Sequence, residues 1–195
     1  MEATVACLNE RGYANLTTAE VAARAGVSKG AQLYHFPKKD DLVVAALEYL
    51  FAQRVAASRE AIRDLPAKKN EKIDALIDVL WPVYTGPTFY AWLELVIASR
   101  TDVALRQAVA RTTERFSHEV RQTWREAFGR PTDDPERFLP LDSVINGQLA
   151  SMAIGRLLAE HDEGATDRHH TEMLGWLKRI GNFLLHGIDA QRRVV

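Results

Sequence analysis

Residues 15–39 read Asn-Leu-Thr-Thr-Ala-Glu-Val-Ala-Ala-Arg-Ala-Gly-Val-Ser-Lys-Gly-Ala-Gln-Leu-Tyr-His-Phe-Pro-Lys-Lys, and the first helix in this stretch has recognisable ends. Thr17 is a favourable helix N-cap, and Glu20 three residues later completes the pattern of a capping box. Gly26 follows the last turn, where glycine adopts a left-handed conformation more easily than other residues. The pattern predicts a short helix that ends in a tight turn.

A second short helix follows this turn. Ser28 can cap its start, and Pro37 discourages it from continuing beyond about Phe36. Because the turn is short, the two helices have to cross steeply. The expected apolar contacts between them are Val21, Val27 and Leu33. Residues 17–36 therefore predict the packed helix pair of a helix-turn-helix.

The polar groups of the second helix suit DNA, because a helix-turn-helix places this helix in the major groove. It opens with serine, lysine and glycine, so backbone N–H groups and a positive helix end can face a phosphate. Its glutamine can pair with an adenine edge, and its tyrosine and histidine can contact phosphates or bases. The candidate DNA contacts are Thr17, Thr18, Ser28, Lys29, Gly30, Gln32, Tyr34, His35 and Lys39.

Geometry and charge leave a second interpretation open. The same residues can form two surface helices of an all-α protein, with their lysines merely solvated. Residues 1–39 hold five basic and three acidic side chains, so their net charge is only +2. A strongly basic segment would have favoured DNA binding more decisively.

A resemblance to a known family favours DNA binding. Residues 23–39 closely resemble the DNA-binding signature of the tetracycline-repressor (TetR) family, and Arg11-Gly12-Tyr13 and Thr17-Thr18 are similar to its preceding helix boundaries. The likeness covers roughly the first 50 residues. It implies a bacterial transcription regulator, usually a repressor, with nine or more helices. Such proteins are usually homodimers whose C-terminal domain binds a small inducer.

The sequence departs from the family pattern at three places. Leu33 stands where a tyrosine is common, and Tyr34 comes one residue later. Lys38 replaces a common capping serine, so the following helix is expected to start less sharply. Met1 lies within the first helix, where relatives usually carry a further basic arm. We expect either a short N-terminus or a natural start further upstream.

Composition limits the classes of protein. The 195 residues are 47% hydrophobic and 26% charged, with a net charge of −1, which is typical of a globular protein with a core. The charge argues against a uniformly basic nucleic-acid coat. The single cysteine, Cys7, excludes an internal disulfide and is expected to be buried. The sequence has neither a signal peptide nor a long apolar run, so we expect a cytoplasmic protein without membrane association.

The periodicity beyond the helix-turn-helix is helical throughout, which predicts an all-α fold. We expect an N-terminal helix-turn-helix domain of three helices, residues 1–47, and a larger C-terminal ligand-binding and dimerisation domain, residues 48–195. Further helices are expected at about 39–65, 71–84, 88–100, 103–128, 139–160 and 168–188.

Aromatic residues concentrate between residues 81 and 124, where the family resemblance implies an inducer pocket. Effector pockets are mostly apolar with a few polar anchors. The candidate ligand-binding residues are Trp81, Tyr84, Phe89, Trp92, Thr112, Phe116, His118 and Gln122. Each aromatic residue can equally belong to an ordinary core.

The last two helices carry stripes that suit an oligomer. Small residues recur every four positions in the first of them, and an apolar stripe follows in the second, so two helices from each chain could form a four-helix bundle. The candidate dimer contacts are Gly147, Ser151, Gly155, Leu177, Gly181 and Leu184. The alternative is that both stripes pack within one chain.

The sequence contains none of the common catalytic motifs, so we do not expect an enzyme. An all-α enzyme or a non-DNA-binding scaffold remains the alternative function. The one metal-like cluster is His161, Asp162, Glu163, His169 and His170, which we expect to be solvated residues around a loop, with neither metal nor cofactor. The preferred function is a dimeric repressor that binds a palindromic DNA operator and is released by a small apolar or aromatic effector.

Overall fold

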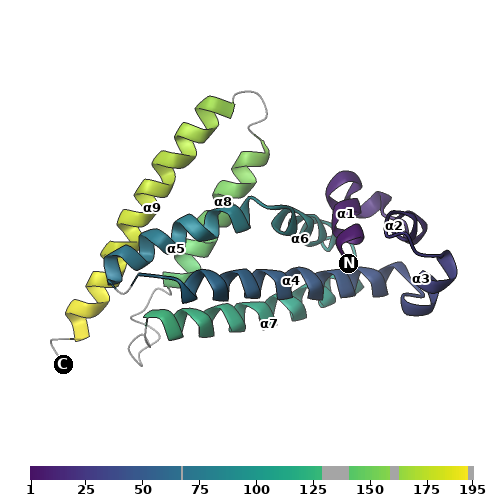
Figure 1. Cartoon of the computed structure of the whole chain (residues 1–195), viewed down its shortest axis with the longest axis horizontal. Coiled ribbons are helices and arrows are strands. Elements are labelled where there is room, and N and C mark those ends of the chain that lie inside the picture. The colour runs from purple at the N-terminus through teal and green to yellow at the C-terminus, as the bar shows by residue number, and fades with distance from the viewer. Residues whose placement is uncertain (67, 129–140, 159–162, 193–195) are drawn as a thin grey trace. The chain divides into compact units, whose positions relative to one another are not determined.

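The computed structural model describes residues 1–66, 68–128, 141–158 and 163–192, and these ranges contain helices and connecting turns without a strand (Figure 1). The predicted all-α fold is confirmed. The helices are α1 (Glu2–Asn15), α2 (Thr18–Arg24), α3 (Lys29–His35), α4 (Lys39–Arg63), α5 (Lys69–Tyr84), α6 (Pro87–Ala98), α7 (Val103–Phe128), α8 (Leu141–Leu157) and α9 (Glu163–Arg192).

Helix boundaries follow local signals in the sequence. Pro87 stands in the first turn of α6, where its missing N–H leaves no helical bond unmade. Pro82 lies inside α5, so the apolar face of that helix outweighs the local penalty of proline. Helix α9 begins several residues before the expected Arg168. No helix in the described ranges is long and apolar enough to cross a membrane.

The chain forms two compact units, and neither is a continuous stretch of sequence. The first comprises Met1–Ala57 and Gly86–Glu119, and the second comprises Ser58–Thr85 and Val120–Val195. The chain passes from one unit to the other inside α4, between α5 and α6 at Thr85–Gly86, and inside α7. Both units therefore share two uninterrupted helices.

In the first unit, α1, α2, α4, α6 and α7 share one apolar core. Its most deeply buried members, each at most 2% exposed, are Cys7, Leu8, Leu16, Leu42, Val43, Leu47, Leu50, Ala91 and Leu95. The expected burial of Cys7 is confirmed. Each leucine or valine among them contributes about 1.5–3 kcal/mol by leaving water.

In the second unit, α5, α8 and α9 pack together. Their fully buried side chains include Ile73, Leu76, Ile77, Ile145 and Leu149, and Leu177 of α9 is 2% exposed. Polar contacts join the helices at the edges of this core. Tyr84 donates a hydrogen bond from its hydroxyl to Asn146 Oδ1 at 2.8 Å, and Lys178 forms an ion pair with Asp78 at 2.6 Å.

A kink in α1 connects this helix to α6. Gly12 adopts φ 71° and ψ 168°, a left-handed conformation that glycine tolerates best. The next backbone N–H, from Tyr13, donates to Glu94 Oε1 of α6 at 2.7 Å. A Cβ at position 12 would lie 2.9 Å from the same oxygen, so both the conformation and the close approach favour glycine.

Candidate DNA-binding surface and effector region

Capping bonds begin both helices of the predicted pair. Thr17 Oγ1 accepts from Glu20 N at 3.2 Å, and Ser28 Oγ accepts from Ala31 N at 3.1 Å. Gly26 between the helices has φ 67°. The two caps and the left-handed turn are therefore confirmed, and each capping side chain contributes about 1 kcal/mol.

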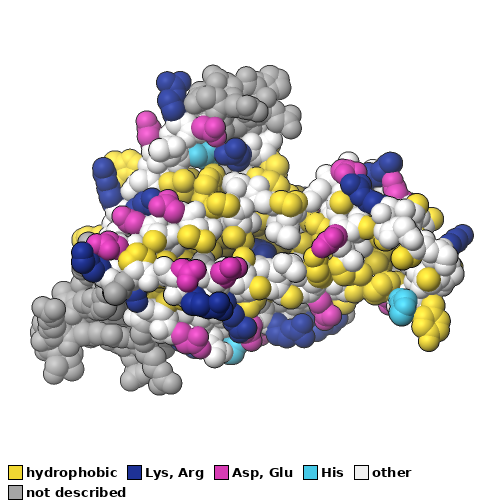
Figure 2. Space-filling model, viewed as in Figure 1, with side chains coloured by type: hydrophobic (Ala, Val, Ile, Leu, Met, Phe, Trp, Pro, Cys, Tyr) yellow, Lys and Arg dark blue, Asp and Glu magenta, His cyan; other side chains and the backbone are white. Residues whose placement is uncertain are grey.

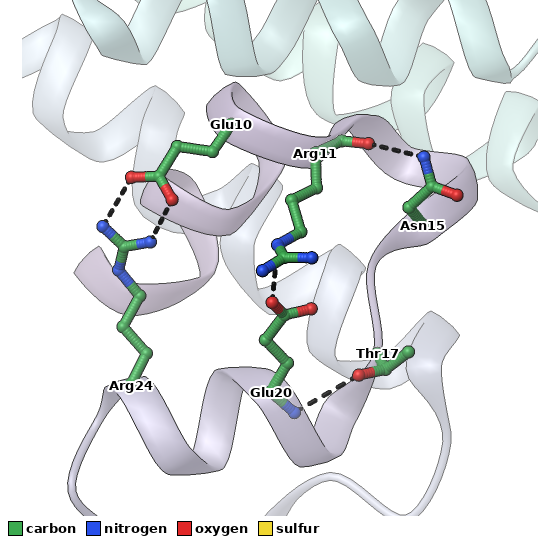
Figure 3. A network of polar contacts seen from close by, with 6 residues as sticks. All are labelled: Glu10, Arg11, Asn15, Thr17, Glu20 and Arg24. Carbon is green, nitrogen blue, oxygen red and sulfur yellow. Dashed lines mark hydrogen bonds and ion pairs between the residues drawn. The ribbon is translucent and has the colours of Figure 1, made fainter.

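Two ion pairs fix α2 against α1 (Figure 3). The Arg24 guanidinium donates to both oxygens of Glu10, at 2.5 and 2.6 Å, and Arg11 Nε pairs with Glu20 Oε1 at 2.6 Å. The hydrogen bond from Arg24 lowers the pKa of the Glu10 carboxyl, and Glu10 in turn raises the pKa of Arg24. Both arginines therefore already have acidic partners, which makes the lysines the more available cations.

The inward side of α3 differs from the expectation. Gln32 is only 5% exposed, and its Nε2 donates to the Phe36 carbonyl at 2.9 Å. Leu33 and Val27, expected as contacts between the helices, are 41% and 47% exposed. Gln32 and Phe36 are four residues apart and share one face of the helix, and this face lies toward the protein. The prediction that Gln32 pairs with a base is therefore corrected, because its side chain is enclosed.

The outward side of α3 presents the other candidates. Lys29, Gly30 and His35 are exposed, and Tyr34 is 83% exposed. The Tyr34 and His35 rings lie edge to face with centroids 5.2 Å apart. Figure 2 shows a hydrophobic side chain and a histidine projecting at the α3 end of the view. Both rings are therefore accessible to a partner.

Lys39 at the start of α4 is half-buried. Its Nζ donates to the Tyr13 carbonyl at 2.6 Å and lies 4.2 Å from the centre of the Tyr13 ring. Burial lowers the pKa of this lysine. Lys39 thus fastens the start of α4 to the end of α1. Nearby, Lys38 N donates to Asp41 Oδ2 at 3.1 Å, which is the bond that the acidic residue of a capping box makes to the backbone of the N-cap.

Comparisons with known proteins agree with this geometry. Residues 1–46 match the family of bacterial regulatory proteins, tetR family. The HTH-type transcriptional regulator CymR of Pseudomonas putida is 34% identical over 140 residues, covering 70% of this chain and 68% of CymR.

The chain belongs to the TetR family. Solved structures support this assignment along nearly the whole chain. A Rhodococcus sp. protein described as a TetR-family regulator is 25% identical with a TM-score of 0.66, covering 90% of this chain and 93% of its own. FadR of Bacillus subtilis, solved with stearoyl-CoA, has the same fold, with 17% identity, a TM-score of 0.64 and 94% of both chains covered.

This TetR-family chain is a DNA-binding transcriptional regulator and not an enzyme. Among the residues whose positions are described, no three His, Cys, Asp or Glu side chains are grouped closely enough to hold a metal ion. His161 and Asp162 of the metal-like cluster lie outside the described residues.

The expected effector residues of this TetR-family chain divide between the two units. In the first unit, Phe89 is fully buried, and the Phe89 and Trp92 ring centroids lie 5.6 Å apart. Phe116 packs on Phe51 of α4 at 4.8 Å. Thr112 is buried and donates its hydroxyl to Ala108 O at 2.8 Å, so this donor is already engaged within α7. His118 is exposed.

In the second unit, the remaining expected effector residues have other partners. The Trp81 ring lies 5.3 Å from the His170 ring, and Tyr84 bonds to Asn146. Gln122 is exposed and donates to Glu126 of its own helix at 3.1 Å. Within the described residues, the first unit thus offers the denser aromatic group.

Sequence analysis missed Arg54 of α4. This arginine is 4% exposed and lies among the rings of Phe89, Trp92 and Phe116. The spacing of Arg54 in the sequence could have identified it. It follows Leu50 by four residues and Phe51 by three, so it falls on the apolar stripe of the helix. A charged residue on such a stripe is uncommon enough to be examined.

The expected dimer contacts are exposed on α8 but mostly buried on α9. Gly147, Ser151 and Gly155 are exposed on α8, and a Cβ at either glycine would meet nothing within 4 Å. The small-residue stripe therefore lies on an open face of this chain.

On α9 the expectation is corrected for two residues. Leu177 is 2% exposed, and Gly181 is buried against Ile73 and Ile145 of the same chain. Leu184 is half-buried. The outward stripe of α9 consists instead of Trp176, Ile180 and Phe183, which are 58%, 46% and 76% exposed.

Proposed function

We propose that this regulator is a repressor that binds a palindromic operator as a homodimer and is released by a small, largely apolar effector. The DNA-binding part of this proposal rests on the exposed side chains of α3, a lysine and the Tyr34–His35 pair. The side-chain caps of α2 and α3 define where these two helices begin. Transcriptional regulation also requires access to the chromosome, which supports a cytoplasmic location.

The proposed DNA contacts follow from exposure. Lys29 and the N–H groups around Gly30 face phosphates, and Tyr34 and His35 meet phosphates or base edges. Thr17, Thr18 and Ser28 lie at the starts of α2 and α3, where their backbone N–H groups suit phosphates. Lys39 acts mainly by holding α4 on α1, and its ammonium contacts phosphate only if its bond to Tyr13 is exchanged.

We further propose that residues 1–47 form the DNA-binding domain and that residues 48–195 bind effector and form the dimer. The family match over residues 1–46 supports the first limit. The solved FadR structure with stearoyl-CoA supports an apolar effector, because it has this fold.

A polar link suits the transfer of an effector signal from α6 to the DNA-binding domain. Glu94 of α6 accepts from the Tyr13 amide, and Asn9 Nδ2 donates to Pro87 O at 3.0 Å. On the same helix, Trp92 is two residues from Glu94, which places it about 200° around the axis. A movement of α6 caused by a ligand on its aromatic face would therefore be transmitted to α1 through the hydrogen bond between Glu94 and the Tyr13 amide.

A gel-shift experiment tests the DNA contacts. The full chain is titrated on the promoter region of its own gene at several salt concentrations. Lys29→Ala should weaken binding to all sequences and reduce the slope of log affinity against log salt by about 1, because one phosphate contact is lost. Arg111→Ala, at an exposed position on α7, is the control and should bind like the wild type. Equal slopes for all three proteins would contradict the assignment.

The dimer is proposed on the open faces of α8 and α9. The α8 stripe of small residues is flanked by Ile154 and Leu158, which are 40% and 85% exposed, and α9 adds its outward stripe. A two-fold dimer would match a palindromic operator with half-sites about one DNA turn apart.

Sedimentation tests the dimer. A Cβ at Gly155 meets no atom within 4 Å, and the position is exposed, so Gly155→Leu should leave the subunit folded while it separates the close-packed helices. Gln107→Leu adds the same side chain at an exposed site on α7 and is the control. An unchanged sedimentation mass for Gly155→Leu would refute this interface.

A further inference from the structure

The exposed side of α3 lacks the side chains that read bases by paired hydrogen bonds. Gln32 is enclosed and bonds to the Phe36 carbonyl, and the helix contains no arginine, asparagine, aspartate or glutamate. Its remaining polar side chains at the two ends are Lys29 and His35. Between these ends, the exposed side of the helix is mainly apolar.

Tyr34 stands at the centre of this exposed side. It follows Gln32 by two residues, which places it about 200° around the helix axis from the enclosed amide. Its side chain is 83% exposed, against 41% for the adjacent Leu33. Its ring meets the His35 ring edge to face, with centroids 5.2 Å apart. Tyr34 therefore presents most of its ring to whatever surface α3 meets.

Gly30 lies one helical turn before Tyr34 on the same side of α3. Glycine is unfavourable within a helix, so its presence needs a reason. Its backbone is not left-handed, unlike that of Gly12 and Gly26. An added Cβ would meet Ser28 Oγ at 3.9 Å, an ordinary contact, and no other atom within 4 Å among the described residues. The close approach of an external surface to α3 accounts for this glycine.

We propose that Tyr34 determines operator specificity by packing its ring on the C5-methyl group of a thymine in the major groove, with Gly30 providing the clearance for this contact. The thymine methyl is the apolar group that bases present in this groove, so it matches an exposed ring. Cytosine carries only a hydrogen at the same position. This inference rests on the proposed DNA contacts of α3 and names the base that they select.

Removal of single methyl groups from the operator tests this contact. A site is first selected with the full-length wild-type chain from a random duplex library. Each thymine of the selected duplex is then replaced in turn by deoxyuridine, which lacks only the C5-methyl group. Affinities are measured by fluorescence anisotropy at low salt, so that weakened variants stay bound.

The wild type should depend on one methyl group in a half-site. At that thymine, deoxyuridine should weaken binding about three- to five-fold, the effect expected when one methyl group no longer leaves water. At the same position, 5-methylcytosine paired with guanine should bind more tightly than cytosine by a similar factor. The second comparison keeps the hydrogen-bonding groups of the base constant while the methyl group is added.

Variants assign the methyl dependence to residues. Tyr34→Ala should bind the thymine and deoxyuridine duplexes equally, whereas Tyr34→Phe keeps the ring and should keep the preference for thymine. Leu33→Ala, at the adjacent exposed position, is the matched control and should also keep it. Gly30→Leu should weaken binding by roughly ten-fold or more, the effect of overpacking a close contact. Thermal melting followed by circular dichroism should show each variant folded, because all three positions are exposed.

Three results would overturn the inference: no thymine whose methyl group affects wild-type binding, an undiminished preference for thymine in Tyr34→Ala, or a Gly30→Leu chain that binds as tightly as the wild type. Equal binding of thymine and deoxyuridine duplexes by the wild type, together with weaker binding by Tyr34→Phe, would assign the Tyr34 hydroxyl to a phosphate instead.

Failure of the proposed DNA contacts gives a different result. A wild-type chain that selects no site from the library would refute the contacts of α3 as a whole, and this inference with them. A selected site that is bound without any methyl dependence would refute the thymine contact alone. The two failures are therefore distinguishable.

Discussion

Replacement of Gly181 by alanine tests the packing of α9 in quantitative terms. The added Cβ would lie 2.8 Å from Ile73 Cγ2 of α5 and 3.3 Å from Ile145 Cδ1 of α8. Overpacking of this kind destabilises by about 1–3 kcal/mol, and the methyl on the β-branched Ile73 has little freedom to move. Against this, alanine is favoured over glycine inside a helix by about 1 kcal/mol. We expect a net loss of about 1 kcal/mol in the free energy of unfolding.

Gly175 on the same helix provides a matched control. A Cβ there meets nothing within 4 Å, so Gly175→Ala should gain the helix preference of about 1 kcal/mol without a clash. The difference between the two variants therefore isolates the contact with α5 and α8. Urea denaturation followed by circular dichroism, at one protein concentration, measures both. If Gly181→Ala were as stable as Gly175→Ala, the close approach of α9 to Ile73 would be refuted.

Three further predictions concern single side chains. Gln32→Leu should leave base preference in a binding-site selection unchanged, because this side chain is enclosed; a shift at one base pair would restore it as a base contact. Glu94→Gln should weaken the charge-assisted bond from the Tyr13 amide by about 1 kcal/mol and speed exchange of that amide, measured by NMR; unchanged exchange would argue against the link. Burial, assisted by the charge of Arg156, lowers the pKa of His170 below its ordinary 6.5, so the folded state favours the neutral ring. Stability should therefore fall as the pH drops below about 6.5, and His170→Phe should flatten this slope in urea titrations at several pH values.

The helix-turn-helix could be predicted because its determinants are local. Thr17, Gly26 and Ser28 act within three or four residues of themselves, so sequence spacing alone specifies the two caps and the turn. The all-α fold followed from periodicity for the same reason. Helix α7 extends over Val103–Phe128, the span its pattern predicted.

The predictions that were wrong concern which face of a helix packs against a neighbouring helix. Polarity suggested that Gln32 points outward, but its position four residues before Phe36 places it on the packed side. Helix α9 carries two apolar stripes, and periodicity does not say which of them meets α5 and α8. Arg54 was overlooked because a charge was not expected among core rings. These choices depend on residues far away in sequence, which local patterns do not contain.

The passage of α4 and α7 through both compact units has a consequence for protein engineering. The chain passes between the units three times, and only the passage at Thr85–Gly86 lies between helices; the two helical crossings divide α4 between Ala57 and Ser58 and α7 between Glu119 and Val120. A hybrid regulator has to be joined within two helices at once. A junction displaced by one residue would rotate all that follows by about 100° around the helix axis, and every core side chain beyond it would point the wrong way. Sensor domains transplanted between relatives of this chain must therefore be matched in helical phase at both crossings.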